Sequence, residues 1–420
     1  MTTAKKFLLI GVSEWGYGPI STLKPVLDQL KDYYEIIIYV KSSHVINFIK
    51  TNCNYIKFFI NDYTDLMLLK NINLVLSCMH IGVLLFAKKY NIPAYCIDNL
   101  YYFWNWGNND FHKFYIILNN NDISNPETYK KLQALPNYGA YIAMYTLSKN
   151  IFIQKYCNNY NLNKLFKNKI LEIPPIIKKI KINNLHSNKH GILISFSGLI
   201  TPYSTENNIL LYMTFIKKIL YNILISYNKD ILITVPKDVL LLAKKVFTNF
   251  KINITSLSQQ DFFTEMSNRR LLFVPCGFST TYEAMYYKIP LIFLPEFQDG
   301  NFHNYLGMGN FNNFTIKKMK KIFPGLFIKE FSSSSKYISV NDLYKEYNIY
   351  IHDKLLIRKY RKYISFITYI FYKNYIEKFS LQKNFLSKKT NNFNGENIII
   401  NTINVLYIIY KNDVYFIYFV

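Results

Sequence analysis

Residues 271–299 of this chain read LLFVPCGFSTTYEAMYYKIPLIFLPEFQD. The apolar runs 271–274 and 291–294 have the length and composition of buried strands. Between them, a turn of small residues leads into a helical pattern, so the stretch predicts a strand–helix–strand unit of a parallel sheet. In such a unit the residues that follow both strands lie at one edge of the sheet, which is where parallel sheets bind ligands.

The start of the predicted helix suits an anion. It carries Gly277, Ser279 and Thr280, at a point where free backbone N–H groups and the helix dipole favour a phosphate. One turn later, Glu283 is placed to accept hydrogen bonds from a sugar diol. A polar pair that suits a second sugar follows the second strand: Gln298 and Asp299. These features predict a nucleotide-sugar site.

The alternation of apolar runs and helical patterns extends over most of the chain, which is typical of parallel α/β domains. Besides the two strands above, we expect strands at 7–12, 34–40, 73–77, 93–97, 191–196, 230–234 and 253–255. We expect helices at 20–30, 82–89, 209–226 and 239–247. The predicted fold class is α/β, with two Rossmann-like parallel-sheet domains that face a central cleft.

A boundary between the two halves is predicted near residues 174–188, where paired prolines precede a basic, polar run. This places an acceptor-binding domain at 1–175 and a nucleotide-sugar-binding domain at 189–375, followed by a tail of uncertain structure at 386–420. The helical stretch 341–385, rich in Tyr and Lys, is expected to return to the first domain.

The last residues, 397–420, are very apolar but are interrupted by Lys411, Asn412 and Asp413. A membrane span needs a longer uncharged run. The pattern therefore favours a strand pair or a buried tail, and it leaves interfacial membrane contact or a loose extension as alternatives.

The 420 residues carry 50 Lys and Arg against 26 Asp and Glu, a formal net charge of +24. Because the lysines are scattered, we do not expect nucleic-acid binding, whereas a basic face on an anionic membrane or a phosphorylated substrate stays open. The five cysteines form no C-x-x-C pair, which argues against zinc and disulfides and indicates a reducing cytoplasm. The apolar run 7–10 is too short for a signal-peptide core. We expect a cytoplasmic protein. Peripheral association with the inner face of the membrane stays open, as does the oligomeric state.

Three residues after strands of the first domain are candidate general bases: Glu14, His80 and Asp98. A base must lie within hydrogen-bond reach of the acceptor hydroxyl. Each residue also has a structural interpretation. Glu14 would be a solvated loop carboxylate, His80 would cap a helix, and the residues around Asp98 would pack in the core. The aromatic residues within 101–106 suggest an apolar or flat acceptor, such as a lipid or a natural product.

Further candidates lie in turns after strands. The loop 11–20 contains three glycines that permit close ligand approach, although their spacing is not that of a dinucleotide fingerprint. In the second domain, Gly198 is placed to approach a diphosphate from the side opposite Gly277. Ser258 lies where a nucleobase would bind, and it is also a good helix N-cap.

Residues 271–304 resemble the GT-B glycosyltransferases, in particular the branch with the UDP-glucuronosyl/UDP-glucosyltransferases, the antibiotic-modifying glycosyltransferases and the lipid-II-forming N-acetylglucosaminyltransferase. The family's motif is matched in order by Gly277, Thr280, Glu283, Ala284, Pro290, Pro295, Gln298, Asp299 and Asn304. The resemblance implies diphosphate contacts at Gly277, Ser279 and Thr280, ribose binding by Glu283, and donor-sugar contacts by Gln298 and Asp299. It implies metal-independent, inverting transfer from a UDP- or dTDP-sugar to an acceptor hydroxyl, without a separate cofactor.

The chain departs from this family at two motifs. Residues 275–277 are Pro-Cys-Gly where the family often has His-Gly-Gly, and residues 16–19 are Gly-Tyr-Gly-Pro where it has Gly-His-x-x-Pro. Tyr17, with an ordinary pKa of about 10, is a poor base. The base is therefore expected among Glu14, Asp98 and His80. A non-catalytic auxiliary protein of the same fold and a nucleotide-sugar 2-epimerase remain as alternatives.

Overall fold

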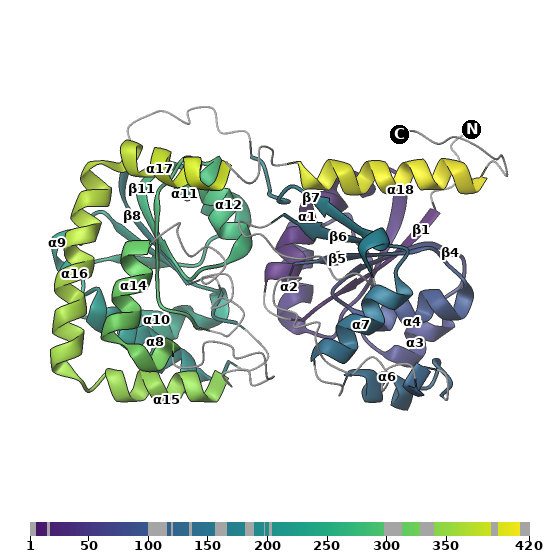
Figure 1. Ribbon diagram of the computed structural model, residues 1–420, viewed down its shortest axis with the longest axis horizontal. Coiled ribbons are helices and arrows are strands. Elements are labelled where there is room, and N and C mark those ends of the chain that lie inside the picture. Colours follow the sequence, from purple (N-terminus) through teal and green to yellow (C-terminus); the bar gives the residue numbers. More distant parts are fainter. Residues whose placement is uncertain are drawn as a thin grey trace.

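The computed structural model describes residues 6–14, 17–99, 116–118, 121–133, 137–155, 166–180, 189–196, 198–200, 204–297, 313–327, 340–387 and 394–411. Within these residues the chain forms two parallel sheets with helices packed against them (Figure 1). The predicted α/β fold class with two parallel-sheet domains is confirmed.

The first sheet has the strand order β3-β2-β1-β4-β5-β6-β7. Its strands are β1 (Lys6–Val12), β2 (Tyr34–Tyr39), β3 (Phe58–Ile60), β4 (Ile72–Cys78), β5 (Ala94–Asp98), β6 (Asn150–Gln154) and β7 (Ile170–Ile173). Its helices are α1 (Gly18–Leu30), α2 (Ser43–Asn52), α3 (Tyr63–Leu68), α4 (Ile81–Tyr90), α6 (Pro126–Gln133), α7 (Asn137–Leu147) and the 3₁₀ turn η2 (Lys167–Lys169). Side chains from the two faces of the sheet enter separate apolar cores, which is why its central strands are apolar throughout.

The second sheet has the order β10-β9-β8-β11-β12. Its strands are β8 (His190–Ser195), β9 (Ile231–Thr234), β10 (Asn253–Thr255), β11 (Arg269–Val274) and β12 (Leu291–Phe293). The elements between the strands are α8 (Glu206–Ile219), α9 (Tyr221–Ser226), η3 (Lys237–Val239), α10 (Leu240–Val246), α11 (Gln259–Asn268) and α12 (Phe278–Tyr286). The strand order reverses between β8 and β11, as it does between β1 and β4 in the first sheet, and such reversals are where open parallel sheets bind ligands.

Six further elements follow the second sheet: α14 (Asn313–Ile322), η4 (Pro324–Phe327), α15 (Val340–Tyr350), α16 (Lys354–Lys373), α17 (Tyr375–Ser387) and α18 (Gly395–Lys411). The stretch that we expected to return to the first domain stays on the second, because α16 buries Ile357, Tyr360 and Ile364 in the core of the second sheet. The returning element is α18, which packs on α1 (Figure 1).

Of the two forms expected for the tail, the strand pair is wrong, because residues 395–411 are helical. The buried tail is confirmed for Ile399, Ile400 and Ile403, which are buried on the first domain, and residues 412–420 lie outside the described residues. No helix in the described part of the chain is both long and apolar enough to cross a membrane.

The segment after β7 joins the domains. The Tyr287 hydroxyl, on the second domain, donates to the Lys178 carbonyl at 3.1 Å and accepts from Ile180 N at 3.0 Å. Lys179 forms a 2.8 Å ion pair with Glu396 of α18. These contacts fix the path of the chain between the two sheets.

Candidate functional site

Residues that follow the strands of the two sheets meet each other. Ser279, in the first turn of α12, lies 3.3 Å from Thr22 of α1, measured between their hydroxyl oxygens. Tyr282 of α12 donates a long hydrogen bond of 3.5 Å to the carbonyl of Lys155, which follows β6. The carboxyl edges of both sheets therefore contribute to one junction.

The N-terminus of α12 lies at the strand reversal of the second sheet. Gly277 is its N-cap residue and supplies no side-chain cap to the first turn. The first N–H groups of a helix have no partner within the helix, so this end is suited to an anion. Thr280 is half-buried in the same turn. The Ser279 hydroxyl, expected to contact a diphosphate, contacts Thr22 across the domain junction.

Three glycines at the sheet edges have open space where a side chain would project. Among the described residues, a Cβ placed on Gly18 or on Gly198 would have no other heavy atom within 4 Å, and one on Gly277 would come no closer than 3.8 Å, to Pro275 O. None of the three has a positive φ, so neither local packing nor backbone strain requires glycine there. Gly11 differs, because its Cβ would lie 2.5 Å from Val83. Gly11 therefore lets α4 pack on β1.

Glu283 is a buried carboxylate one turn into α12. Its side chain is 6% exposed. Burial raises the pKa of Glu283 to about 8, and Lys178 opposes that rise only in part. Burial of a charged carboxylate is costly, so a ligand hydroxyl that donates a hydrogen bond to Glu283 would lower that cost.

A second buried carboxylate, Glu296, follows β12 and was not singled out by sequence reasoning. Neither of its oxygens has a hydrogen-bond partner among the described residues. Burial raises the pKa of Glu296 well above its ordinary value, and the nearby backbone of Cys276 opposes this. An isolated acidic residue after an apolar strand carries no sequence signal that would reveal its burial.

Three tyrosine hydroxyls hold the backbone around Glu296, and we call them the tyrosine clamp. Tyr212 of α8 donates to Pro295 O at 2.7 Å, and Tyr344 of α15 donates to Phe297 O at 3.2 Å. Tyr347 of α15 donates to Glu296 O. The clamp fixes the segment that leads to the predicted sugar-binding pair. Gln298 and Asp299 themselves lie outside the described residues.

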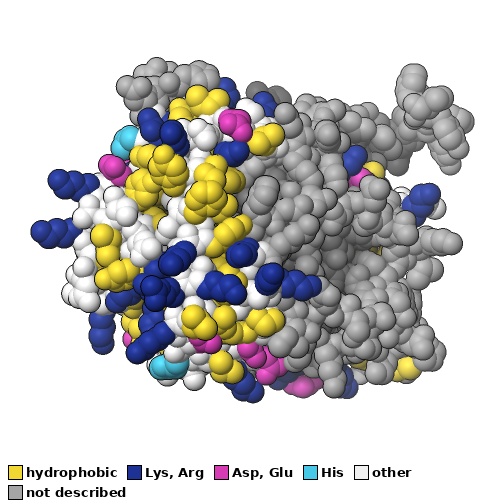
Figure 2. Space-filling model, turned by 60° about the vertical axis from the view of Figure 1, so that its left-hand side comes forward, with side chains coloured by type: hydrophobic (Ala, Val, Ile, Leu, Met, Phe, Trp, Pro, Cys, Tyr) yellow, Lys and Arg dark blue, Asp and Glu magenta, His cyan; other side chains and the backbone are white. Residues whose placement is uncertain are grey.

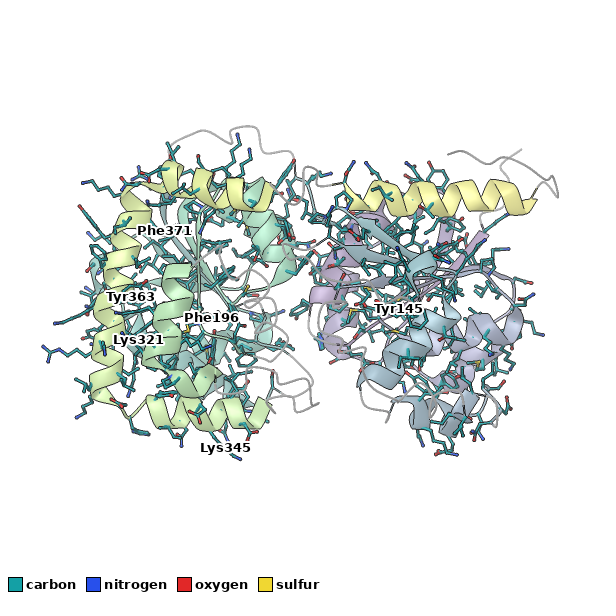
Figure 3. All side chains as sticks on the ribbon, in the orientation of Figure 1. Tyr145, Phe196, Lys321, Lys345, Tyr363 and Phe371 are labelled. Carbon is teal, nitrogen blue, oxygen red and sulfur yellow. The ribbon has the colours of Figure 1, made fainter. Side chains whose placement is uncertain are left out.

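Of the candidate bases, Glu14 is half-buried after β1, and its carboxylate accepts a 3.0 Å hydrogen bond from the backbone N–H of Lys41. Asp98 is 1% exposed at the end of β5 and accepts a hydrogen bond from the hydroxyl of Tyr145, on α7 (Figure 3). Both carboxylates are therefore used to organise the first domain.

His80 caps α4, which was the structural interpretation of this residue. Its Nδ1 accepts a hydrogen bond from Gly82 N at 3.1 Å, and its Nε2 lies 3.5 Å from the hydroxyl of Tyr129. Burial lowers the pKa of His80 to about 4, and Lys41 adds to the effect. A histidine with so low a pKa is a weak base at neutral pH.

Tyr17 is the N-cap residue of α1. Burial, and then Asp238 of the second domain, raise the pKa of Tyr17 above its ordinary value. This makes the tyrosine a still poorer base than its residue type indicates. The interaction with Asp238 also places the loop after β1 near the loop after β9.

Ser258 is exposed and caps α11, where it accepts a 3.1 Å hydrogen bond from Asp261 N. Its own hydroxyl donates to the Asp261 carboxylate at 2.6 Å. The aromatic cluster at 101–106, expected near the acceptor, lies outside the described residues. Within the described ranges, no three His, Cys, Asp or Glu side chains gather in a way that could hold a metal ion.

No family model matches the chain, and no curated protein matches it. Several solved structures have a similar fold. The UDP-glucosyltransferase of Polygonum tinctorium that can glucosylate indoxyl is 11% identical, with 92% of this chain and 98% of that chain covered and a TM-score of 0.43. Phytolacca americana UGT2, solved with UDP-2fluoro-glucose and pterostilbene, is 11% identical over 87% and 94% of the two chains, with a TM-score of 0.44. S. aureus MnaA, solved with UDP, is 14% identical over 89% and 98%, with a TM-score of 0.43. These values describe a distant similarity.

Proposed function

We propose that this protein binds a nucleotide-diphosphate sugar at the carboxyl edge of its second sheet and transfers the sugar to an acceptor held by the first domain. The observation that carries the proposal is Glu283, a carboxyl group buried one turn into a helix that has no side-chain cap and lies at a strand reversal. A ribose diol can donate hydrogen bonds to such a group.

The phosphate groups would lie against the first turn of α12. Gly277 and Gly198 leave the space that a diphosphate needs to approach the backbone. As the bond to the sugar breaks, negative charge develops on the leaving diphosphate, and backbone N–H groups that are already oriented stabilise it. We propose an inverting, metal-independent reaction with a UDP- or dTDP-sugar. Gln298 and Asp299 would contact the sugar. Ser258 lies in the turn that we expect to bind the nucleobase.

A second candidate function is a non-catalytic nucleotide-sugar-binding protein. It is favoured by one observation: Glu14, Asp98 and His80 each make a hydrogen bond that organises the first domain. In a transferase, Glu14 or Asp98 would have to exchange its present hydrogen-bond partner for the acceptor hydroxyl.

Calorimetry with UDP and dTDP tests the donor site. We expect Glu283→Ala to weaken nucleotide binding about 10- to 100-fold, because it would remove two hydrogen bonds to the diol of about 0.5–1.5 kcal/mol each. The matched control is Glu265→Ala, which removes a half-buried carboxylate of α11 that pairs with Arg269 at 2.5 Å. It should leave the affinity unchanged. Absence of nucleotide binding by the unmodified protein would contradict both candidate functions.

Release of UDP in the presence of a panel of phenolic and lipid acceptors separates the two candidates. A transferase should lose turnover in Glu14→Gln or in Asp98→Asn while its nucleotide affinity is kept. A binding protein should show tight nucleotide binding without turnover. Analysis of the sugar product in the absence of an acceptor would reveal an epimerase.

A further inference from the structure

The outward face of α16 combines apolar and basic side chains. Leu355, Phe366 and Tyr369 are 74%, 61% and 53% exposed. The basic residues exposed on the same helix are Lys354, Arg358, Lys359, Lys362 and Lys373. Between Lys354 and Lys373 there is no Asp or Glu. A surface helix normally mixes both signs of charge, so this face is unusual.

These residues form one stripe along the helix. Positions 355, 358, 359, 362, 366, 369 and 373 recur at intervals of three or four residues, which brings them to the same side of an α-helix. The stripe is about 27 Å long at a rise of about 1.5 Å per residue. The opposite side of the helix carries the residues that enter the core: Ile357, Tyr360, Ile364, Ile367 and Phe371. The exposed apolar residues are therefore not needed to fill that core.

Neighbouring helices also expose apolar and basic side chains. On α17, Ile376 and Leu381 are 66% and 57% exposed, and on α9 Ile225 is 51% exposed. Beside α16, α14 exposes Lys320 and Lys321. Figure 2 shows apolar and basic side chains interspersed over this side of the second domain, and Figure 3 labels Lys321 there.

The acidic groups near the stripe already have partners. Asp353, at the start of α16, accepts hydrogen bonds from Leu355 N and Leu356 N at 3.0 and 2.9 Å. Glu377 on α17 pairs with Lys378 at 2.9 Å. These two acids stay charged, but the seven described Lys and Arg residues that α14 and α16 expose outnumber them, so the surface is net positive and its complement is an anionic surface.

We propose that this face, made of the α16 stripe with Ile376 and Leu381 of α17 and the lysines of α14, docks peripherally on an anionic lipid bilayer. Exposed Leu, Phe, Tyr and Ile side chains enter the boundary between headgroups and acyl chains, while Lys and Arg extend their charged ends to the lipid phosphates. Each Lys or Arg near such a surface contributes about 1 kcal/mol, and salt screens that term.

The docking face lies on the side of the second domain that is remote from the first domain (Figure 1). Docking would therefore leave the junction between the sheets accessible. Membrane binding and nucleotide binding are separable properties, and either can fail without the other.

Co-sedimentation of the full chain with lipid vesicles tests the proposal. We expect binding to vesicles of phosphatidylcholine mixed with phosphatidylglycerol, about tenfold weaker binding to phosphatidylcholine alone, and weaker binding at high salt. Phe366→Ser with Tyr369→Ser, and separately Lys359→Glu with Lys362→Glu, should each reduce binding about tenfold or more. Because these side chains are exposed, the variants should keep the thermal stability of the unmodified protein, as checked by circular dichroism.

Matched controls lie on α10. Leu241 is 83% exposed, and Lys244 and Lys245 are exposed beside it. Leu241→Ser, and Lys244→Glu with Lys245→Glu, make the same chemical changes on another helix and should leave binding unchanged. The proposal is overturned by absence of binding to the anionic vesicles, by equal binding to both kinds of vesicle, or by equal losses in the α10 and α16 variants.

Discussion

At the residue scale, the second domain contains two buried glutamates. Glu283 and Glu296 are each 6% exposed, and neither oxygen of Glu296 has a hydrogen-bond partner among the described residues. In both, burial raises the pKa and so favours the protonated form in the folded protein. Buried acids with a raised pKa often mark functional sites.

Glu283 gives the stability of the protein a defined pH dependence. Its pKa rises from the ordinary 4.5 to about 8 on folding, so within this range the folded protein holds a proton that the unfolded chain has lost. Stability should therefore fall as the pH rises from 4.5 towards 8. Urea unfolding at several pH values should show a shallower fall in Glu283→Gln. Glu265→Gln should keep the slope of the unmodified protein, and a slope unaffected by Glu283→Gln would refute this assignment.

At the scale of elements, the tyrosine clamp connects α8 and α15 to the segment after β12. Three consecutive carbonyls, those of residues 295–297, each accept a hydrogen bond from a tyrosine hydroxyl. Because the clamp acts on backbone carbonyls, it holds residues 295–297 whatever their side chains are. Helices α8 and α15 thus fix the last described residues after β12.

Tyr212→Phe should destabilise the protein by about 1–3 kcal/mol, because the Pro295 carbonyl would lose its donor in a buried place. Tyr360→Phe is the matched control, since the Tyr360 hydroxyl is buried without a hydrogen-bond partner among the described residues. Its removal should be neutral or stabilising. Chemical unfolding of both variants measures the difference, and equal effects would show that the Tyr212 hydrogen bond contributes no net stability.

At the scale of the whole molecule, polar contacts between described residues connect the two domains. The Tyr287 hydroxyl bonds to two backbone atoms of the joining segment. Lys179 pairs with Glu396, and Thr22 meets Ser279. Such a junction is suited to relative movement of the domains.

Tyr287→Phe should loosen the joining segment. Loss of about 1 kcal/mol of local stability corresponds to about fivefold more frequent opening, so trypsin should cleave at Lys178 and Lys179 about fivefold faster. Tyr360→Phe should be cleaved at the rate of the unmodified protein. An unchanged rate in Tyr287→Phe would show that the hydroxyl does not limit opening of the segment.

Sequence patterns predicted the central strands of both sheets, because these strands are continuous apolar runs. They missed β3, β6 and β7, of 3, 5 and 4 residues, although they predicted β10 and β12, which have 3 residues each. They joined α8 and α9 into one helix, whereas the structure divides them at Leu220. Short apolar runs do not distinguish a strand from a buried turn of helix, and pairing with a neighbour settles the matter.

The sequence by itself determined the two α/β halves, the strand ends and the candidate residues that follow them, because these depend on neighbours along the chain. Only the tertiary structure decided which polar groups are already satisfied. Glu14 meets a partner 27 residues away and Asp98 meets one 47 residues away, whereas the buried oxygens of Glu296 have none among the described residues. Whether a buried polar group has a partner depends on residues that folding brings together from distant positions, and local sequence does not encode it.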